Sequence, residues 1–105
     1  MKPINPSDNT CPVRKSLGVL GGKWTLLILF QINDRVRRYG EIKRAIPGIS
    51  EKVLIQELKR LIEHKLVVRK AYPEIPPHVE YRLTKKGLET LIIADALADF
   101  GLKNL

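Results

Sequence analysis

Four polar side chains recur at helical spacing in the middle of the chain: Lys52, Gln56, Lys59 and Glu63. At about 100° per residue they project from one side of a helix. Lysine donates hydrogen bonds to the acceptors of guanine, and glutamine pairs with adenine. We therefore interpret Lys52 and Gln56 as candidate base-reading residues, and Lys59 and the flanking Arg60 as candidate phosphate contacts.

The opposite side of this segment is apolar, which predicts a helix with one face turned to a core. Four residues form the stripe: Leu54, Leu58, Leu61 and Ile62. Ser50 stands where an N-cap is expected, and Glu51 in the first turn complements the helix dipole. The helix is therefore expected to begin directly after Ser50.

A shorter helix is predicted just before it, because Tyr39, Ile42 and Ile46 fall on one helical face and Pro47 and Gly48 end the pattern. A short helix, a tight turn that holds a glycine and a longer helix form a helix-turn-helix. In such motifs the second helix lies in the major groove of DNA. The alternative is a surface helix of an ordinary bundle.

A hairpin follows, since "LVVRKAY" and "VEYRL" resemble strands and the tip between them is rich in proline. Prolines fix φ, so the tip is ordered before it meets a ligand and less entropy is lost on binding. Its basic residues suggest a wing that touches DNA through Lys70, His78 or Arg82. The alternative is that the prolines only stiffen an exposed loop.

Two further helices are predicted at the amino end. The first begins at Pro12 and ends at Gly21 and Gly22. The segment "KWTLLILFQI" is apolar on all sides, as a buried helix or a buried strand would be, and we prefer the helix. A turn is expected at Asn33 and Asp34.

The carboxyl-terminal segment "LETLIIADALADFGLKNL" predicts a helix with more apolar surface than one small domain can cover. We expect it to form a homodimer through Leu88, Leu91, Ile92, Ala96, Leu97 and Phe100. Two-fold symmetry would place two recognition helices about one DNA turn apart, on an inverted repeat. The alternative is that this helix merely closes the core of the monomer.

The charge distribution favours a polyanionic partner for the middle of the chain. The net charge is +8, and residues 35–70 hold eleven basic and four acidic residues, whereas residues 87–105 have a net charge of −2. A solvated surface is the alternative. At 105 residues, the chain is expected to hold a flexible arm at 1–10 and one domain at 11–105. We expect no membrane span and no signal peptide, which predicts a cytoplasmic protein.

The remaining reactive side chains offer little catalytic chemistry. His64 and His78 lack a partner pattern for catalysis, and two histidines with one cysteine cannot form an ordinary structural zinc site. We therefore predict no enzyme, no metal and no cofactor. Cys11 is a candidate redox sensor, because a helix amino terminus with Arg14 and Lys15 nearby favours the thiolate. The alternative is a buried, structural cysteine.

Four quoted segments, "CPVRKSLGVLGGKWTLLIL", "RRYGEIKRAIPGIS", "LKRLIEHKLVVR" and "YPEIPPHVEYRLTKKG", together resemble the HxlR family of bacterial winged helix-turn-helix transcriptional regulators. The resemblance implies a small cytoplasmic regulator that binds double-stranded DNA as a homodimer. Some members use a cysteine at the position of Cys11 to sense oxidants or quinone-like electrophiles. Ile55 departs from the family, which more often has a small hydroxyl residue there.

The predicted fold class is therefore α+β, mainly α, with a two-stranded wing and a carboxyl-terminal dimerisation helix. The predicted function is sequence-specific regulation of transcription at an inverted-repeat operator, with oxidants or electrophiles as the candidate signal. The alternative is a winged-helix module that binds RNA or a protein, since a fold does not fix its ligand. The predicted DNA contacts are Arg38, Ser50, Lys52, Ile55, Gln56, Lys59, Arg60, Lys70, His78 and Arg82.

Overall fold

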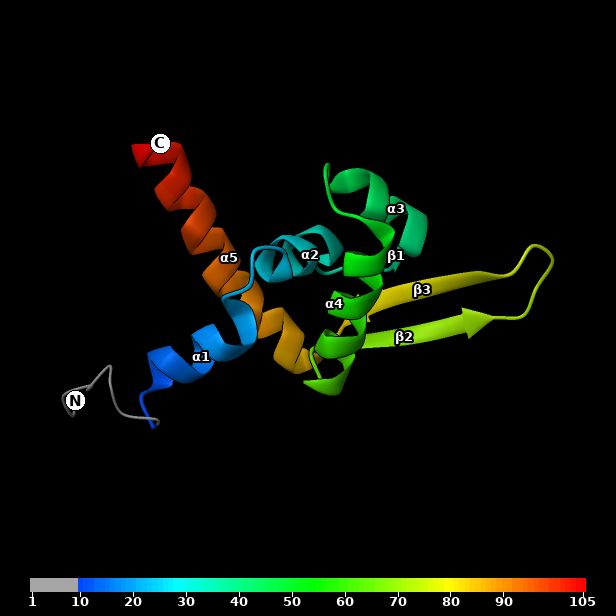
Figure 1. Cartoon of the computed structure of the whole chain (residues 1–105), viewed down its shortest axis with the longest axis horizontal. Helices are drawn as coiled ribbons and strands as arrows, with labels where there is room; N and C mark the ends of the chain where they lie inside the picture. Colours follow the sequence, from blue (N-terminus) through cyan, green and yellow to red (C-terminus); the bar gives the residue numbers. More distant parts are fainter. Residues whose placement is uncertain (1–9) are drawn as a thin grey trace.

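The computed structural model describes residues 10–105, so the expected arm at residues 1–10 lies outside the described residues except for Thr10. Within this range the chain forms a winged helix-turn-helix, as predicted. Its elements are α1 (Pro12–Leu20), α2 (Thr25–Ile32), β1 (Arg37–Arg38), α3 (Tyr39–Ala45), α4 (Glu51–Glu63), β2 (Val67–Tyr72), β3 (His78–Leu83) and α5 (Lys85–Asn104) (Figure 1).

The two amino-terminal helices lie where the sequence predicts them. Pro12 takes the first helical position of α1, and the amide of Gly21 donates to the carbonyl of Leu17 at its end. The segment after the two glycines is a helix and not a strand, and four of its eight residues are buried: Thr25, Ile28, Leu29 and Ile32. Burial by neighbouring elements explains the apolar character of this side of α2, whereas Leu27 and Phe30 of the same helix are exposed.

The helix pair α3–α4 follows the local signals closely. The Oγ atom of Ser50 accepts a hydrogen bond from the amide of Val53 at 3.1 Å, which caps α4. Gly48 adopts φ +88° in the turn, a conformation that a residue with a side chain rarely takes. Leu54, Leu58 and Leu61 are buried along α4, so the predicted apolar stripe faces the core.

The sheet has one strand more than predicted. Strands β2 and β3 form an antiparallel hairpin from the pair Val67 and Leu83 to the pair Tyr72 and His78. We call this hairpin, residues 67–83, the wing. Strand β1 adds to its β3 edge through Arg37 opposite Tyr81, so the expected two-stranded sheet is a three-stranded one in the order β1-β3-β2. The prediction failed because two residues are too few to show a strand pattern, and their pairing is non-local.

The core joins the helices to the base of the wing, and α5 packs on it from one side. Tyr81 and Leu83 of β3 are buried with the apolar residues of α2 and α4. Gly87, Thr90 and Ala94 are the buried residues of α5, so much of that long helix faces outward. Figure 1 shows the tip of the wing and the pair α1 and α5 at opposite ends of the molecule. No helix in residues 10–105 is long and apolar enough to cross a membrane.

Candidate nucleic-acid interface

The outer face of α4 is exposed as predicted, and it carries the candidate base-reading residues. Lys52, Gln56, Lys59 and Glu63 are all exposed. Ile55 has 42% of its surface exposed, so an apolar side chain stands beside these polar ones. Lysine and glutamine can donate to base edges, and an apolar side chain can contact the methyl group of thymine. The outer face of α4 thus offers both kinds of base contact.

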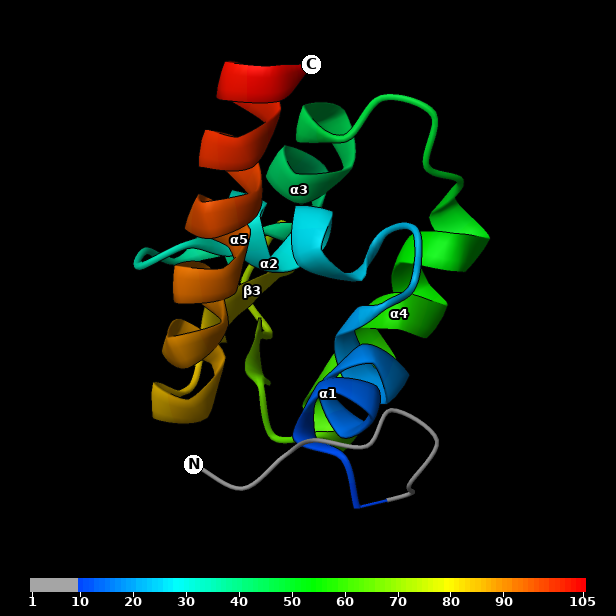
Figure 2. The same ribbon diagram turned by 90° about the vertical axis from the view of Figure 1, so that its left-hand side faces the viewer.

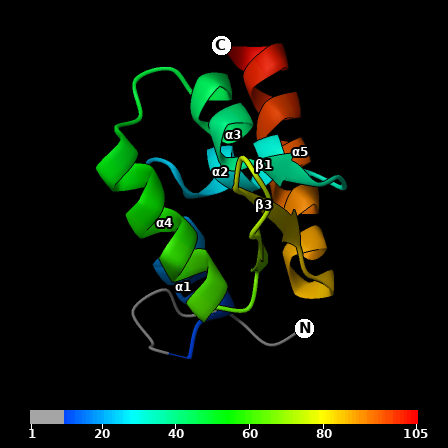
Figure 3. The ribbon, with the colours of Figure 1, turned by 90° about the vertical axis from the view of Figure 1, so that its right-hand side faces the viewer.

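A hollow of about 780 Å³ lies between α4, α3 and the wing. We call it the basic hollow, because four cationic side chains line it: Arg38, Arg44, Lys59 and Arg69. In residues 10–105 none of the four is in an ion pair. The hollow is also lined by Leu58, Ile62 and Val79. Figure 3, seen from the side of the wing tip, shows α4, α3 and the wing around this region. Four cations that form no ion pair are suited to hold phosphates.

The two acidic residues that line the hollow, Glu41 and Glu51, lie in the first turns of α3 and α4. The carboxylate of Glu41 accepts a hydrogen bond from the amide of Arg38 at 2.8 Å. That bond first, and the charges of Arg37, Arg38 and Arg44 after it, lower the pKa of Glu41. Burial and the neighbouring Glu51 carboxylate raise the pKa of Tyr39, so its phenol stays neutral. A lowered pKa keeps Glu41 ionised, but the four cations of the hollow outnumber its two acidic residues, Glu41 and Glu51, so its net charge is positive.

The wing divides its cations between two faces. In an antiparallel pair, directly opposite residues point to the same face. Arg69 lies opposite Tyr81, and both line the hollow. Lys70 lies opposite Glu80, and Arg82 lies opposite Val68. Lys70 and Arg82 therefore point to the other face of the wing. One DNA segment in the hollow would therefore meet Arg69 and not Arg82. The sequence analysis did not place Arg69 among the candidate contacts, because only the strand register shows that its side chain lines the hollow.

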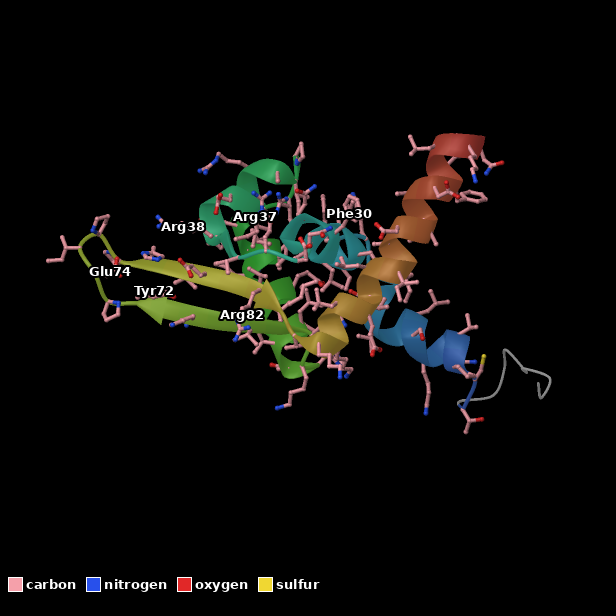
Figure 4. The ribbon with its side chains drawn as sticks, turned by 180° about the vertical axis from the view of Figure 1, so that it is seen from behind. Phe30, Arg37, Arg38, Tyr72, Glu74 and Arg82 are labelled. Carbon is pink, nitrogen blue, oxygen red and sulfur yellow. The ribbon has the colours of Figure 1, made fainter. Side chains whose placement is uncertain are left out.

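The outer part of the wing is ordered by contacts among its own side chains. The rings of Tyr72 and His78 stack with centroids 4.6 Å apart, and the Nζ atom of Lys70 lies 4.9 Å from the centre of the Tyr72 ring. Nε2 of His78 lies 3.1 Å from a carboxylate oxygen of Glu80, and Glu74 approaches its other ring nitrogen at 3.8 Å. Figure 4 shows Tyr72 and Glu74 toward the end of the wing. His78 thus already has two anionic neighbours, which weakens its case as a phosphate contact.

The structure contradicts the prediction that Arg60 contacts a phosphate. Its Nη2 atom donates to the carbonyl of Val19 at 2.7 Å and to the hydroxyl of Thr25 at 3.0 Å. Glu57 of the same helix lies 3.5 Å from that nitrogen. The guanidinium is therefore bound on the side of α4 that faces the α1–α2 connection. A residue that flanks the outer face of a helix can turn inward wherever a neighbour offers acceptors, and the α4 sequence alone does not show this.

The second exposed surface is apolar and lies on α1, α2 and α5 (Figure 2). We define the apolar face by its exposed residues: Leu17, Leu27, Phe30, Ile92, Ile93, Leu97 and Phe100. A groove of about 730 Å³ runs between the three helices and is lined by Leu17, Phe30 and Leu97 among others. Of the predicted interface residues Leu88, Ile92, Ala96, Leu97 and Phe100 are exposed, but Leu91 packs on the core. Leu91 differs from the other five because it lies on the same side of α5 as the buried residues Gly87, Thr90 and Ala94.

Cys11 stands directly before α1, where the sequence places it, but its side chain is buried at 4% exposure. Its carbonyl accepts a hydrogen bond from the amide of Lys15 at 3.0 Å. In the part of the chain that the structure describes, no group of three or more His, Cys, Asp or Glu residues could hold a metal ion. The described surfaces with a distinct character are thus the basic hollow with the α4 face, and the apolar face.

Comparison with known proteins gives concordant matches. Residues 19–105 match the family model described as HxlR-like helix-turn-helix. The chain is 40% identical over 105 residues to YtfH of Escherichia coli strain K12, an uncharacterised HTH-type transcriptional regulator, and covers 83% of that protein.

Two solved structures are similar to this chain in fold as well as in sequence. One is a protein from Porphyromonas gingivalis W83, provisionally described as a MarR-family transcriptional regulator. It is 62% identical with a TM-score of 0.93, and the match covers 94% of this chain and 97% of that one. The other is the oxidised form of the redox regulator HypR, at 34% identity and a TM-score of 0.85 over 90% of this chain and 98% of that one.

Proposed function

The chain belongs to the HxlR-like helix-turn-helix family of transcriptional regulators, and from this premise we propose that it binds an inverted-repeat DNA operator as a homodimer. The observation that carries the proposal is the basic hollow beside the exposed face of α4. Such a DNA-bound role also implies a cytoplasmic protein. Each part of the proposal rests on a different surface of the molecule.

The α4 face is proposed to enter the major groove, with Lys52 and Gln56 at the base edges. Both lie in the amino-terminal half of α4, the part of a recognition helix that is nearest the bases. Ser50 and Ile55 border the same end, and Ile55 can contact a thymine methyl group. Sequence preference is thus assigned to side chains in the first two turns of α4.

The basic hollow is proposed to hold one stretch of the DNA backbone between α4 and the wing. Arg38, Arg44, Lys59 and Arg69 line it from four separate elements, and none of them is in an ion pair within the described range. Binding phosphates would therefore break no ion pair of these four residues. Such contacts fix register and orientation and supply salt-dependent affinity, while the α4 face supplies sequence preference.

The apolar face is proposed to be the dimer interface. It exposes large side chains, with Ile92 at 74%, Phe100 at 57% and Leu97 at 54% exposure. Burying such side chains against a second copy gains about 25 cal/mol for each Å² of apolar surface removed from water. Residues 87–105 also have a negative net charge, so this region is not suited to bind DNA. A two-fold axis near α5 would place the two α4 helices on one side of a duplex.

Selection of ligands from a random duplex library tests the proposal. The purified chain is incubated with the library under excess non-specific competitor, and a library of structured and single-stranded RNA is run in parallel. We expect one enriched inverted repeat among the duplexes and no enriched RNA. Enrichment of single-stranded or looped RNA would instead favour an RNA-binding module. Enrichment in neither library would favour a protein-docking module.

The proposed function does not require a redox response. HypR is a redox regulator, and this chain resembles it in structure. In this chain, however, Cys11 is buried, and reactive thiols are typically accessible. We therefore propose a structural role for Cys11. Either reaction of the thiol would first require local opening: an oxidant would convert it to a disulfide between protomers or a mixed disulfide, and an electrophile would form an adduct with it.

A further inference from the structure

A polar cluster on the inner side of α4 joins the recognition helix to the connection between α1 and α2. The guanidinium of Arg60 donates to the carbonyl of Val19, one residue before the end of α1, and to the hydroxyl of Thr25, the first residue of α2. That hydroxyl donates in turn to the carboxylate of Glu57 at 3.3 Å. One turn of α4 thus binds both α1 and α2.

The cluster is tightly packed, and its central hydroxyl is shut off from water. Thr25 is fully buried, with no exposed surface. A Cβ atom at Gly22 would lie 2.8 Å from its Oγ1 atom, so the connection can approach this closely only because residue 22 lacks a side chain. A buried hydroxyl without partners costs about 1–3 kcal/mol, whereas here it both accepts and donates a hydrogen bond. The contact is therefore specific in its geometry.

The cluster lies between the two surfaces assigned above. On one side, α4 carries Lys52 and Gln56 on its outer face. On the other, the α1–α2 connection contributes Gly22 and Lys23 to the groove of the apolar face. A displacement of α4 relative to the apolar face would have to break the contacts of Arg60.

We propose that Arg60 is a positioning residue that fixes the separation and angle of the two recognition helices in the dimer. This inference rests on the proposed binding of a dimer to an inverted repeat. The buried leucines of α4 hold it to the core through non-directional contacts that tolerate small shifts. The planar guanidinium adds donors in fixed directions and so sets the position of the helix. One base pair of spacing corresponds to about 3.4 Å along the duplex, so a firmly held pair of helices rejects an altered spacing.

Lys59 provides a matched control, since it is the neighbouring basic residue on the same helix. Its side chain is exposed and lines the basic hollow, whereas Arg60 is turned inward. Loss of a phosphate contact lowers the affinity for every operator by one common factor. Loss of a positioning contact changes the relative affinities of operators that differ only in spacing. The roles of Lys59 and Arg60 are thus distinguished by the ratio of the affinities for operators of different spacing. A general loss of protein stability lowers these affinities together and leaves their ratio unchanged.

The experiment measures binding of the full chain to the selected operator and to versions with one base pair inserted or removed between the half-sites. Wild type, Arg60→Met, Arg60→Lys and Lys59→Met are compared over a range of salt concentrations. We expect wild type to bind the altered spacings about tenfold more weakly, a cost similar to that of a mismatched base pair. Arg60→Met should reduce this penalty to about threefold or less, with an unchanged salt slope, and Arg60→Lys should fall between the two.

Lys59→Met should keep the wild-type spacing penalty, and its salt slope should fall by about one. Thr25→Val is the second variant, because it removes one acceptor of Arg60 with little change in volume, and it decides the matter if Arg60→Met does not fold. It should also reduce the spacing penalty. The inference is overturned if wild type binds all spacings equally, or if the folded variants keep the full penalty. An absence of any selected operator would instead count against the proposed function.

Discussion

The two exposed surfaces of this chain differ in almost every physical property. The side formed by α4, α3 and the wing concentrates cations, and residues 35–70 alone hold eleven basic residues against four acidic ones. The side formed by α1, α2 and α5 exposes leucine, isoleucine and phenylalanine instead. Charge left without partners favours a polyanion, and apolar area left uncovered favours a second protein surface. The contrast indicates that one small domain separates its DNA contact from its assembly contact.

The largest effect is expected from a charge on the apolar face. Leu97→Asp should prevent dimer formation, because an unpaired carboxylate would be buried in the interface. The affinity for the full operator should then fall by about 100-fold or more, since the two half-sites are no longer bound together. Sedimentation and operator titration measure the two effects. Val36→Asp is the control, because Val36 is an exposed apolar residue outside the apolar face. A dimeric, tightly binding Leu97→Asp protein would contradict this assignment.

The next effect concerns the reading of bases by α4. A protein with both Lys52→Ala and Gln56→Ala should lose sequence preference, at a cost of about 1–3 kcal/mol for each lost base contact. It should remain dimeric and should still bind unrelated duplexes as wild type does. Titration of the operator and of versions with single base changes measures the preference. If wild type and the double variant discriminated equally between the operator and its altered versions, Lys52 and Gln56 would not be base-reading residues.

A smaller effect should separate the two faces of the wing. Arg69→Met removes a cation from the basic hollow, so the salt slope of binding should fall by about one and the affinity several-fold. Arg82→Met removes a cation from the other face of the same hairpin and should leave the slope unchanged. Binding is measured from low to moderate salt with the same duplex. A decrease for Arg82→Met alone would place the DNA backbone on the opposite face of the wing.

A still smaller effect concerns stability on the side of α5. Thr84 caps this helix, since its hydroxyl accepts from the amide of Gly87 at 2.9 Å and donates to the carbonyl of Lys65 at 2.6 Å. Thr84→Ala should lower the free energy of unfolding by about 1 kcal/mol, whereas Thr84→Ser should keep most of it. Denaturant unfolding at a fixed protein concentration measures both. Equal stability of the two variants would show that the cap adds little.

The smallest effect is expected at Cys11. Because its side chain is 4% exposed, the native thiol should react slowly with a labelling reagent, and mild diamide should not change operator affinity. Cys11→Ser should behave in the same way. Rapid labelling together with a loss of affinity in wild type, absent in Cys11→Ser, would show instead that this thiol senses oxidants.

Local signals predicted most of this fold. Ser50, Pro47 and Gly48 placed the turn and the start of α4, because caps and turn residues act on their immediate neighbours. The short strand β1 was missed, since its pairing with β3 depends on a segment more than forty residues away in the chain. The class of fold was therefore predictable, and the number of strands was not.

The candidate site was predicted in its chemistry but only partly in its directions. Helical periodicity placed Lys52, Gln56 and Lys59 outward, as the structure has them. It failed for Arg60, whose acceptors come from α1 and α2, and for Leu91, which packs on the core. These directions depend on how elements distant in sequence pack together, and periodicity within one element contains no information on that.

The most direct test of the division between the two surfaces is the stoichiometry of the DNA complex. Sedimentation equilibrium of the chain with a labelled operator gives the number of chains on each duplex, and titration with a duplex of one half-site gives the benefit of pairing. We predict two chains on each operator and at least about 100-fold weaker binding to the single half-site. One chain on each operator, with equal affinity for the half-site, would contradict the account.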